Sequence, residues 1–325
     1  MNAVVPELAD TGQESLAALQ TSGDGRFQVG RDGVQAIMAT GDGKVEFIVF
    51  SGHTLACVTS AMGYPAYYPL HPARLQKPVQ AVLMDLDGTS VRSEGFWVWI
   101  IQRTVASLLG DERFELAEED LPYVSGHSVS EHLKYCLRKY APDATVEAAR
   151  DLYFQHVQRE MQAILDGHGR SDAFVPSPGL KEFLLALKER GIKIGLVTSG
   201  LYEKAYPEIV AAFRVMGLGD PRKFYDTIIT AGFPLRKGEI GTLGELSPKP
   251  HPWLYAEAGR VGLGIPFEER NHVVGIEDSG AGICAIRLAG FPAVGMAGGN
   301  LLQSGTRALC WAYCHTFDDV LRIIS

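Results

Sequence analysis

Residues Ala81–Val91 read AVLMDLDGTSV, an apolar run that ends in two aspartates followed by a Gly-Thr pair. We interpret the apolar part as a buried strand. The two aspartates would then lie at its carboxyl end, which is where open α/β sheets bind their ligands. Asp85 and Asp87 are two residues apart, so a regular strand would point both side chains to one face. Two carboxylates at such a short distance repel each other, and a divalent cation bound between them would keep both ionised. An Asp-Gly pair after apolar residues is also a common hairpin turn, so this run alone leaves both interpretations open.

The composition is that of an ordinary globular protein, with 325 residues, 46% apolar and 21% charged. The net charge of −8 and the lack of any Lys/Arg-rich run predict that neither nucleic acid nor membrane is a partner. The N-terminus has no basic region of a secretory signal, and the longest candidate for a membrane span, residues 95–110, is too short. Five scattered cysteines favour reduced thiols, so we expect a cytoplasmic protein.

Residues 1–78 form a lead segment in which Gly- and Asp-containing turns separate short β-branched runs. The runs Val34–Ala39, Lys44–Phe50 and Thr54–Ser60 predict a small antiparallel sheet. The Pro- and Tyr-rich passage Tyr64–Pro78 is interpreted as a linker. No chemistry is recognisable in this segment, so its role stays unknown, and we expect a structural part or a homo-oligomer assembled through it.

Residues 93–172 have a helical pattern, and the chain beyond them alternates helices with strands. Apolar residues recur at helical spacing around Phe96–Val105, His132–Tyr140 and Val146–Ile164. Ser177, Pro178 and Gly191 bracket a further helix, with Ser as N-cap and Pro at the first helical position. Strands are then predicted at the following ranges: Ile192–Thr198, Asp226–Thr230, His272–Ile276 and Pro292–Met296.

This alternation predicts an α/β protein with a doubly wound, Rossmann-like parallel sheet. We therefore divide the chain into a β-rich N-terminal extension (1–78), a core domain (79–92 and 173–325) and an inserted helical cap (93–172). No internal repeat is present.

Four groups of chemically active residues follow strands of the predicted core. They are Asp85–Thr89, Thr198–Gly200, Lys249 between two prolines, and Glu277–Ser279. Each has an ordinary alternative, since hydroxyls cap turns, lysines are solvated and acids stabilise helix N-termini. Together they supply what phosphoryl transfer through an aspartyl intermediate requires. The parts are a carboxylate nucleophile, a second acid for proton transfer, and a hydroxyl, a lysine and Mg²⁺ to neutralise phosphoryl oxygens.

The motifs DLDGT, GLVTSG, KPHPWLY and GIEDSGAGICAIRLAG resemble the four motifs of the haloacid dehalogenase superfamily, over roughly residues 80–300. The helical insertion resembles the cap of the subgroup with phosphoglycolate phosphatase-like enzymes and β-phosphoglucomutase. The resemblance implies that Asp85 is the nucleophile and Asp87 the general acid/base. It implies a Mg²⁺ site made by the Asp85 carboxylate, the Asp87 backbone carbonyl and Asp278, with Glu277 supporting. The phosphoryl group would be bound by Thr198, Ser199 and Lys249.

Asp87 separates the reactions found in this superfamily. Its dehalogenases and phosphonatases lack an aspartate two residues after the nucleophile, which leaves phosphatases and phosphomutases. Mutases similar to β-phosphoglucomutase carry an arginine where this chain has Val129, and a histidine where it has Trp97. We therefore expect a Mg²⁺-dependent phosphatase of a small phosphorylated metabolite. The alternatives are a phosphomutase of the β-phosphoglucomutase type and a non-catalytic phospho-accepting or assembly protein.

The cap loop SGHSVSEHL, residues 125–133, resembles the family's specificity loop. His127, Ser128 and Trp97 are the candidates for substrate contact. The sequence does not name the substrate.

Overall fold

The computed structural model describes residues 16–59, 65–123, 129–170, 172–231 and 247–325. They group into two compact units, each described here by itself. The first unit contains the described residues of 1–90, 177–202 and 221–325. The second contains those of 91–176 and 203–220.

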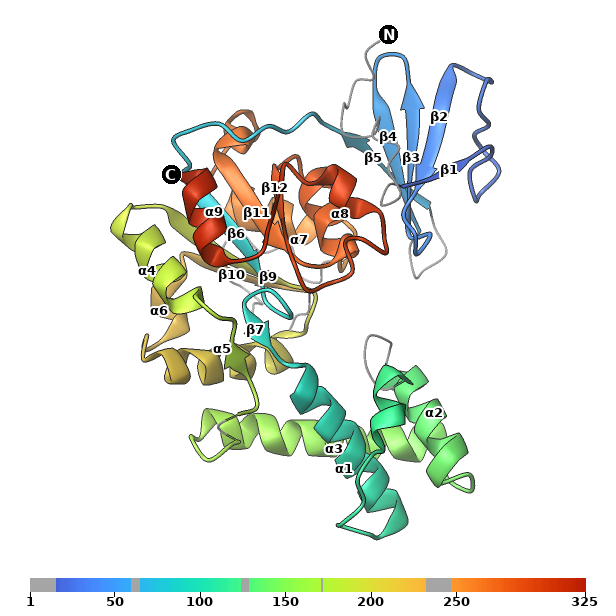
Figure 1. Ribbon diagram of the computed structural model, residues 1–325, viewed down its shortest axis with the longest axis vertical. Coiled ribbons are helices and arrows are strands. Elements are labelled where there is room, and N and C mark those ends of the chain that lie inside the picture. Colours follow the sequence, from blue (N-terminus) through green and yellow to red (C-terminus); the bar gives the residue numbers. More distant parts are fainter. Residues whose placement is uncertain (1–15, 60–64, 124–128, 171, 232–246) are drawn as a thin grey trace. The chain divides into compact units, whose positions relative to one another are not determined.

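The first unit is built on a six-stranded parallel sheet in the spatial order β10-β9-β6-β11-β12-β13 (Figure 1). Its strands are β6 (Ala81–Asp85), β9 (Lys193–Thr198), β10 (Thr227–Thr230), β11 (Val273–Glu277), β12 (Ala293–Met296) and β13 (Ala312–Cys314). Numbered along the chain, the strands lie in the order 3-2-1-4-5-6, the Rossmann arrangement. The chain adds strands to one side of β6 and then, from β11 on, to the other side, so the strand order reverses between β6 and β11. Ligands of such sheets bind beyond the strand ends at that reversal, so the site is expected after Asp85 and Glu277. The predicted fold class is confirmed.

Helices cover both faces of this sheet. The longer ones are α4 (Leu180–Glu189), α8 (Gly280–Leu288) and α9 (Phe317–Ile324). The short elements are α6 (Pro221–Phe224), α7 (Trp253–Ala256), the π-helical turn η3 (Glu257–Gly262) and the 3-10 turns η4 (Phe267–His272) and η5 (Thr306–Leu309). Figure 1 shows α4 and α9 on one side of the sheet and α7 and α8 on the other. The strands between them are buried on both faces, which explains their continuous apolar sequences.

The lead segment forms a five-stranded antiparallel sheet within the same unit, as the alternating runs predicted. It consists of β1 (Ala17–Leu19), β2 (Val34–Ala39), β3 (Val45–Phe50), β4 (Thr54–Thr59) and β5 (Pro65–Leu70) in consecutive order. One face, with Val45, Phe47 and Ala56, belongs to the same buried apolar cluster as Leu254 and Ile286 of the core. The opposite face has its own small cluster around Ile37 and Ile48.

Two details of the sequence interpretation were wrong. The predicted linker Tyr64–Pro78 contains the edge strand β5, in which Pro65 and Pro69 are tolerated because the outer side of an edge strand needs no backbone donors. Helix α4 begins later than the Ser-Pro signal indicated. Its N-cap is Gly179 at φ +78°, and Ser177 instead accepts the Leu180 N–H through its carbonyl.

The second unit is helical, as predicted for the insertion. Its helices are α1 (Glu94–Leu109), α2 (Val129–Tyr140), α3 (Val146–Leu165) and α5 (Tyr202–Met216), with the 3-10 turn η2 (Glu118–Tyr123). The strands β7 (Val91–Arg92) and β8 (Val175–Pro176) pair where the chain enters and leaves the insertion. Tyr202 itself is grouped with the first unit. The domain bounds drawn from the sequence stay a prediction.

In the described part of the chain, no helix is both long and apolar enough to cross a membrane. All five cysteines are free thiols.

Candidate active site

Asp85 ends strand β6 at the centre of the parallel sheet and is 5% exposed. Its strand neighbours are all buried, so the packed backbone places the carboxylate at the carboxyl end of the strand. The Ser90 hydroxyl donates to the Asp85 carbonyl and the Ser90 N–H donates to the Leu86 carbonyl, which closes the turn after the strand. The run AVLMDLDGT is therefore a strand end followed by a tight turn that is not a hairpin.

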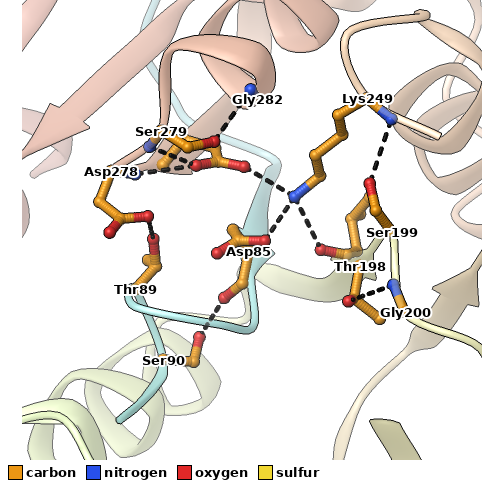
Figure 2. Close-up of polar contacts among 12 residues, drawn as sticks. Asp85, Thr89, Ser90, Thr198, Ser199, Gly200, Lys249, Asp278, Ser279 and Gly282 are labelled. Carbon is orange, nitrogen blue, oxygen red and sulfur yellow. Dashed lines mark hydrogen bonds and ion pairs between the residues drawn. The ribbon is translucent and has the colours of Figure 1, made fainter. Parts of the chain in front are cut away.

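Lys249 is buried and lies between two carboxylates. Its Nζ donates to Asp85 Oδ1, to Glu277 Oε1 at 2.7 Å and to the Val197 carbonyl at 3.3 Å. Its backbone N–H donates to Ser199 Oγ at 3.1 Å. Figure 2 shows the side chain reaching from its loop toward Asp85. The side chain is 7% exposed, so this lysine is not the solvated surface charge that a lone lysine usually is.

Glu277 ends β11, next to β6, and turns back over the start of α8. Its Oε2 accepts the backbone N–H groups of Asp278 and Ser279 at 2.9 and 2.8 Å. A Cβ at position 282 would overlap its carboxylate, so Gly282 leaves the space that Glu277 occupies. Glu277 thus holds Lys249 on one oxygen and the turn carrying Asp278 on the other.

Asp278 approaches the turn after β6. Its Oδ1 accepts from Thr89 Oγ1 at 3.2 Å. Gly88 has φ +87°, and a Cβ there would overlap Asp278 Oδ2. Only glycine meets both demands, because a side chain would be strained by the backbone and would collide with the carboxylate.

The hydroxyls of Thr198, the last residue of β9, and of Ser199 lie beside the Lys249 loop. Thr198 is buried, and its Oγ1 accepts the Gly200 N–H at 2.9 Å. Ser199 Oγ accepts the backbone N–H of Lys249. The GLVTSG turn therefore fixes the Lys249 loop from one side (Figure 2).

The electrostatics of this cluster are unbalanced. Burial and the charges of Glu277 and Asp278 raise the pKa of Asp85 well above its usual range, although the Lys249 ammonium opposes the rise. Burial and the Glu277 charge raise the pKa of Asp278 to about 7. Burial lowers the pKa of Lys249, but Asp85 and Glu277 outweigh it, so the lysine stays protonated. With all three carboxylates ionised, the one ammonium would leave two negative charges in excess, and the raised pKa values reflect the cost of that state.

A divalent cation fits this excess charge. Asp85, Glu277 and Asp278 each offer an oxygen, and these atoms all lie within 4.8 Å of one another. An all-oxygen donor set suits Mg²⁺ better than zinc or copper. The raised pKa of Asp278 fits as well, because a cation would restore the ionised form that burial disfavours.

The remaining predicted site residues are placed as follows. Asp87 is two residues beyond Asp85 and half-buried, at the start of the turn that Gly88 completes. Trp97 lies in α1 of the helical unit, against Phe96 and Phe174, with the Lys204 ammonium 4.1 Å above its ring. His127 and Ser128 lie outside the described residues.

Sequence reasoning assigned no role to Tyr255 or Thr89. Tyr255 is fully buried, and the Lys249 ammonium is 5.1 Å from its ring centroid. Its position six residues after Lys249 gave no signal, since aromatic residues are common in cores. Thr89 was visible within DLDGT, but its bond to Asp278 spans 189 residues.

A family model, haloacid dehalogenase-like hydrolase, matches residues 79–290. The chain belongs to this family of hydrolases. The resemblance drawn from the four motifs is therefore confirmed. The match begins after the N-terminal sheet, which ends with β5 at Leu70.

Three relatives illustrate the family. Glycerol-1-phosphate phosphohydrolase 1 of Saccharomyces cerevisiae is 29% identical over 235 residues, which cover 70% of this chain and 79% of the yeast protein. A putative β-phosphoglucomutase from Thermotoga maritima superposes with TM-score 0.56 and 21% identity, covering 76% of this chain and all of the other. A predicted phosphoglycolate phosphatase from Haemophilus somnus gives TM-score 0.56 and 18% identity, with coverage of 77% and 100%. At these identities the two solved structures support the fold.

Proposed function

We propose that this hydrolase is a Mg²⁺-dependent phosphatase that cleaves a small phosphorylated metabolite through a phospho-aspartyl intermediate on Asp85. The observation that carries the proposal is the buried contact of Lys249 with Asp85 and Glu277, with an Asp278 carboxylate oxygen within 4.8 Å of an oxygen of each of the other two acids. Phosphoryl transfer needs a nucleophile, a cation beside it and a place for a metal ion. In this arrangement Asp85 would be the nucleophile, Lys249 the cation, and the acids Glu277 and Asp278 would attract the metal ion.

In the first step, an Asp85 carboxylate oxygen attacks phosphorus and the bond from phosphorus to the ester oxygen breaks. Asp87 gives its proton to the departing alcohol oxygen. Lys249 and the Thr198 and Ser199 turn face the phosphoryl oxygens, whose charge they offset. Mg²⁺, held by Asp85, Asp278 and the Asp87 carbonyl with Glu277 supporting, would supply further positive charge at those oxygens when bound.

In the second step, water attacks the same phosphorus, and Asp87 takes up one of its protons. The bond between phosphorus and the Asp85 oxygen breaks, which releases inorganic phosphate and restores the carboxylate. Asp87 ends each cycle protonated, ready for the next leaving group.

The yeast relative suggests a first substrate to try. Its printed name describes a glycerol-1-phosphate phosphohydrolase, and it aligns with 70% of this chain. We therefore propose that the substrate is a small phosphomonoester. A substrate screen would begin with glycerol 1-phosphate and continue with 2-phosphoglycolate and hexose 1-phosphates.

The test is hydrolysis of an aryl phosphate and of this panel, with Mg²⁺ and with EDTA. We expect phosphate release with Mg²⁺, none with EDTA, and a fall of at least about 10³-fold in turnover for Asp85→Asn, because the amide is no nucleophile. Asp172→Asn is the matched control, since that aspartate is exposed and pairs only with Arg170 among the contacts described.

Turnover that survives Asp85→Asn would remove Asp85 as the nucleophile. Isomerised sugar phosphate in place of free phosphate would replace the phosphatase with the phosphomutase alternative.

A further inference from the structure

The N-terminal sheet lies outside the family match, yet it contacts two loops of the core: the one that carries Lys249 and the one that packs against Asp278. The match begins at residue 79, and the five strands β1–β5 end at Leu70. One face of the sheet is buried on the core, in the same apolar cluster as α7 and α8. Residues at two points of this sheet make hydrogen bonds to the core beyond that apolar packing.

The first point is Tyr68 of β5. Its hydroxyl is 2.8 Å from His251 Nδ1, and its ring meets those of His251 and Trp253 edge-on at centroid distances of 5.9 and 5.8 Å. Burial lowers the pKa of His251, so the imidazole is neutral near pH 7 and can share one hydrogen with the phenol. Burial raises the pKa of the Tyr68 hydroxyl, which keeps its proton.

His251 is two residues after Lys249 on one short turn. The His251 N–H donates to the Pro248 carbonyl at 3.1 Å, and the Lys249 N–H donates to Ser199 Oγ. The turn is thus held by β9 through Ser199 and by the N-terminal sheet through Tyr68. Between these two anchors, the Lys249 side chain extends to Asp85 and Glu277.

The second point is the turn between β2 and β3. The Gly41 N–H donates to the Ser304 carbonyl at 2.9 Å, and a Cβ at position 41 would overlap the Gln303 carbonyl. The loop it touches also carries Asn300, which accepts the N–H of Gly280 at the start of α8 at 2.7 Å. Gly299 of that loop is so close to Asp278 that a Cβ would overlap the Asp278 carbonyl.

We propose that the N-terminal sheet is a positioning element of the active site, in which Tyr68 fixes the Lys249 loop through His251. This inference rests on the phosphatase reaction proposed above, because it assigns the sheet a part in orienting a phosphoryl-binding lysine. A displacement of such a group by a fraction of an ångström weakens transition-state stabilisation more than it weakens substrate binding.

Two adjacent tyrosines provide a matched pair of variants in the full-length protein. Tyr68→Phe removes the hydroxyl that contacts His251, whereas Tyr67→Phe removes one on the other face of β5, where it donates to Asp24. We expect Tyr68→Phe to lower kcat about tenfold with little change in KM. Tyr67→Phe keeps kcat, and His251→Phe, which removes the other half of the bond, repeats the Tyr68→Phe effect.

A double variant separates positioning from general stabilisation. In a Lys249→Gln background, Tyr68→Phe has no further effect on kcat, because the group that it positions is already gone. An equal loss of kcat in both backgrounds, or equal kcat for Tyr67→Phe and Tyr68→Phe, would overturn the proposal.

Amide hydrogen exchange of the peptide around Lys249, His251 and Trp253 tests the anchor without any turnover. Faster exchange in Tyr68→Phe than in Tyr67→Phe supports the anchor, and equal exchange refutes it. If the wild-type protein hydrolyses no phosphomonoester, the proposed function fails while this measurement still decides whether Tyr68 holds the loop.

Discussion

Each unit contains an aspartate surrounded by polar groups: Asp120, fully buried, in the helical unit and Asp278, half-buried, in the other. Their pKa values shift in opposite directions. In the helical unit, Asp120 is fully buried and accepts from Tyr135 and Lys139, at 2.6 Å each, and from Tyr140. Burial alone would raise its pKa, but the hydrogen bonds from Lys139 and both tyrosines lower it to about 2.

In the first unit, burial and the Glu277 charge raise the pKa of Asp278 to about 7, and the Thr89 hydroxyl is its hydrogen-bond donor. The difference lies in the ratio of donors to carboxylates. Asp120 is surrounded by donors and satisfied by the fold itself. Asp278 and Asp85 share one ammonium with Glu277, so the fold leaves charge that a ligand must neutralise. An acid whose neighbours are mainly other acids, and not donors, therefore indicates a site for a positively charged ligand.

The largest effect is expected at Gly88, where the turn after β6 meets the Asp278 carboxylate. Gly88→Ala strains a backbone at φ +87° and pushes a methyl group into Asp278, so we expect Mg²⁺-dependent turnover to fall about 100-fold. The control is Gly30→Ala, at φ +81°, with no heavy atom of the described residues within 4 Å of the added Cβ.

Both variants carry the same kind of backbone strain, about 1–2 kcal/mol, so stability alone cannot separate them. Steady-state kinetics of the two proteins is the measurement. Equal turnover would mean that the approach of Asp278 to Gly88 is unimportant for catalysis.

The next effect concerns stability, and the two aspartates are expected to respond with opposite signs. Asp120→Asn removes one acceptor oxygen from a carboxylate that accepts from four donors, Tyr135, Lys139, Tyr140 and the Ala117 N–H, and should destabilise the protein by about 1–3 kcal/mol. Asp278→Asn replaces a carboxylate whose pKa of about 7 exceeds its unfolded value of 3.8, so the ionised form costs stability as pH rises through that interval. At pH 8 with EDTA we expect it to raise the melting temperature by a few degrees.

The pH dependence follows the same signs. The stabilisation from Asp120 is present above about pH 4 and is lost as pH falls toward 2, because its folded pKa is lowered from 3.8 to about 2. Urea unfolding of the wild-type protein and both variants from pH 2 to pH 8 is the measurement. A loss of stability in both variants at pH 8 would contradict the proposed difference, since both ionised aspartates would then stabilise the fold.

The smallest effect is expected from proton competition at the proposed Mg²⁺ site. Mg²⁺ needs ionised carboxylates, and the Asp278 carboxyl titrates near pH 7, so the apparent affinity should fall about tenfold per pH unit below 7. Calorimetric titration at pH 6, 7 and 8 in two buffers of different ionisation enthalpy measures affinity and proton release together. Asp120→Asn should give the wild-type profile, and an affinity equal at pH 6 and pH 8 would show that no proton competes.

Much of this architecture could be predicted because local patterns and topology agreed. Apolar strand runs alternating with helices predicted the parallel sheet, and β-branched runs between glycine turns predicted the lead sheet. The start of α4 was misplaced because Ser177-Pro178 resembles a helix start, although Gly179 supplies the cap. Helix α9 was missed, although Thr316 and Asp319 form a capping box that the sequence displays.

Asp85, Lys249, Glu277 and Asp278 were identifiable from sequence because each follows a strand end or lies between prolines, and parallel strands bring such ends to one edge. The sequence by itself thus determined which charged residues the fold brings together and their order along the chain.

The tertiary structure alone decided how those charges are balanced and what supports them. Glu277 contacts Lys249 from 28 residues away along the chain, and Tyr68 contacts His251 across 183 residues. Burial and electrostatic neighbours depend on distances in space, which no local pattern encodes. The same residue type is therefore satisfied at Asp120 and left charged in excess at Asp278.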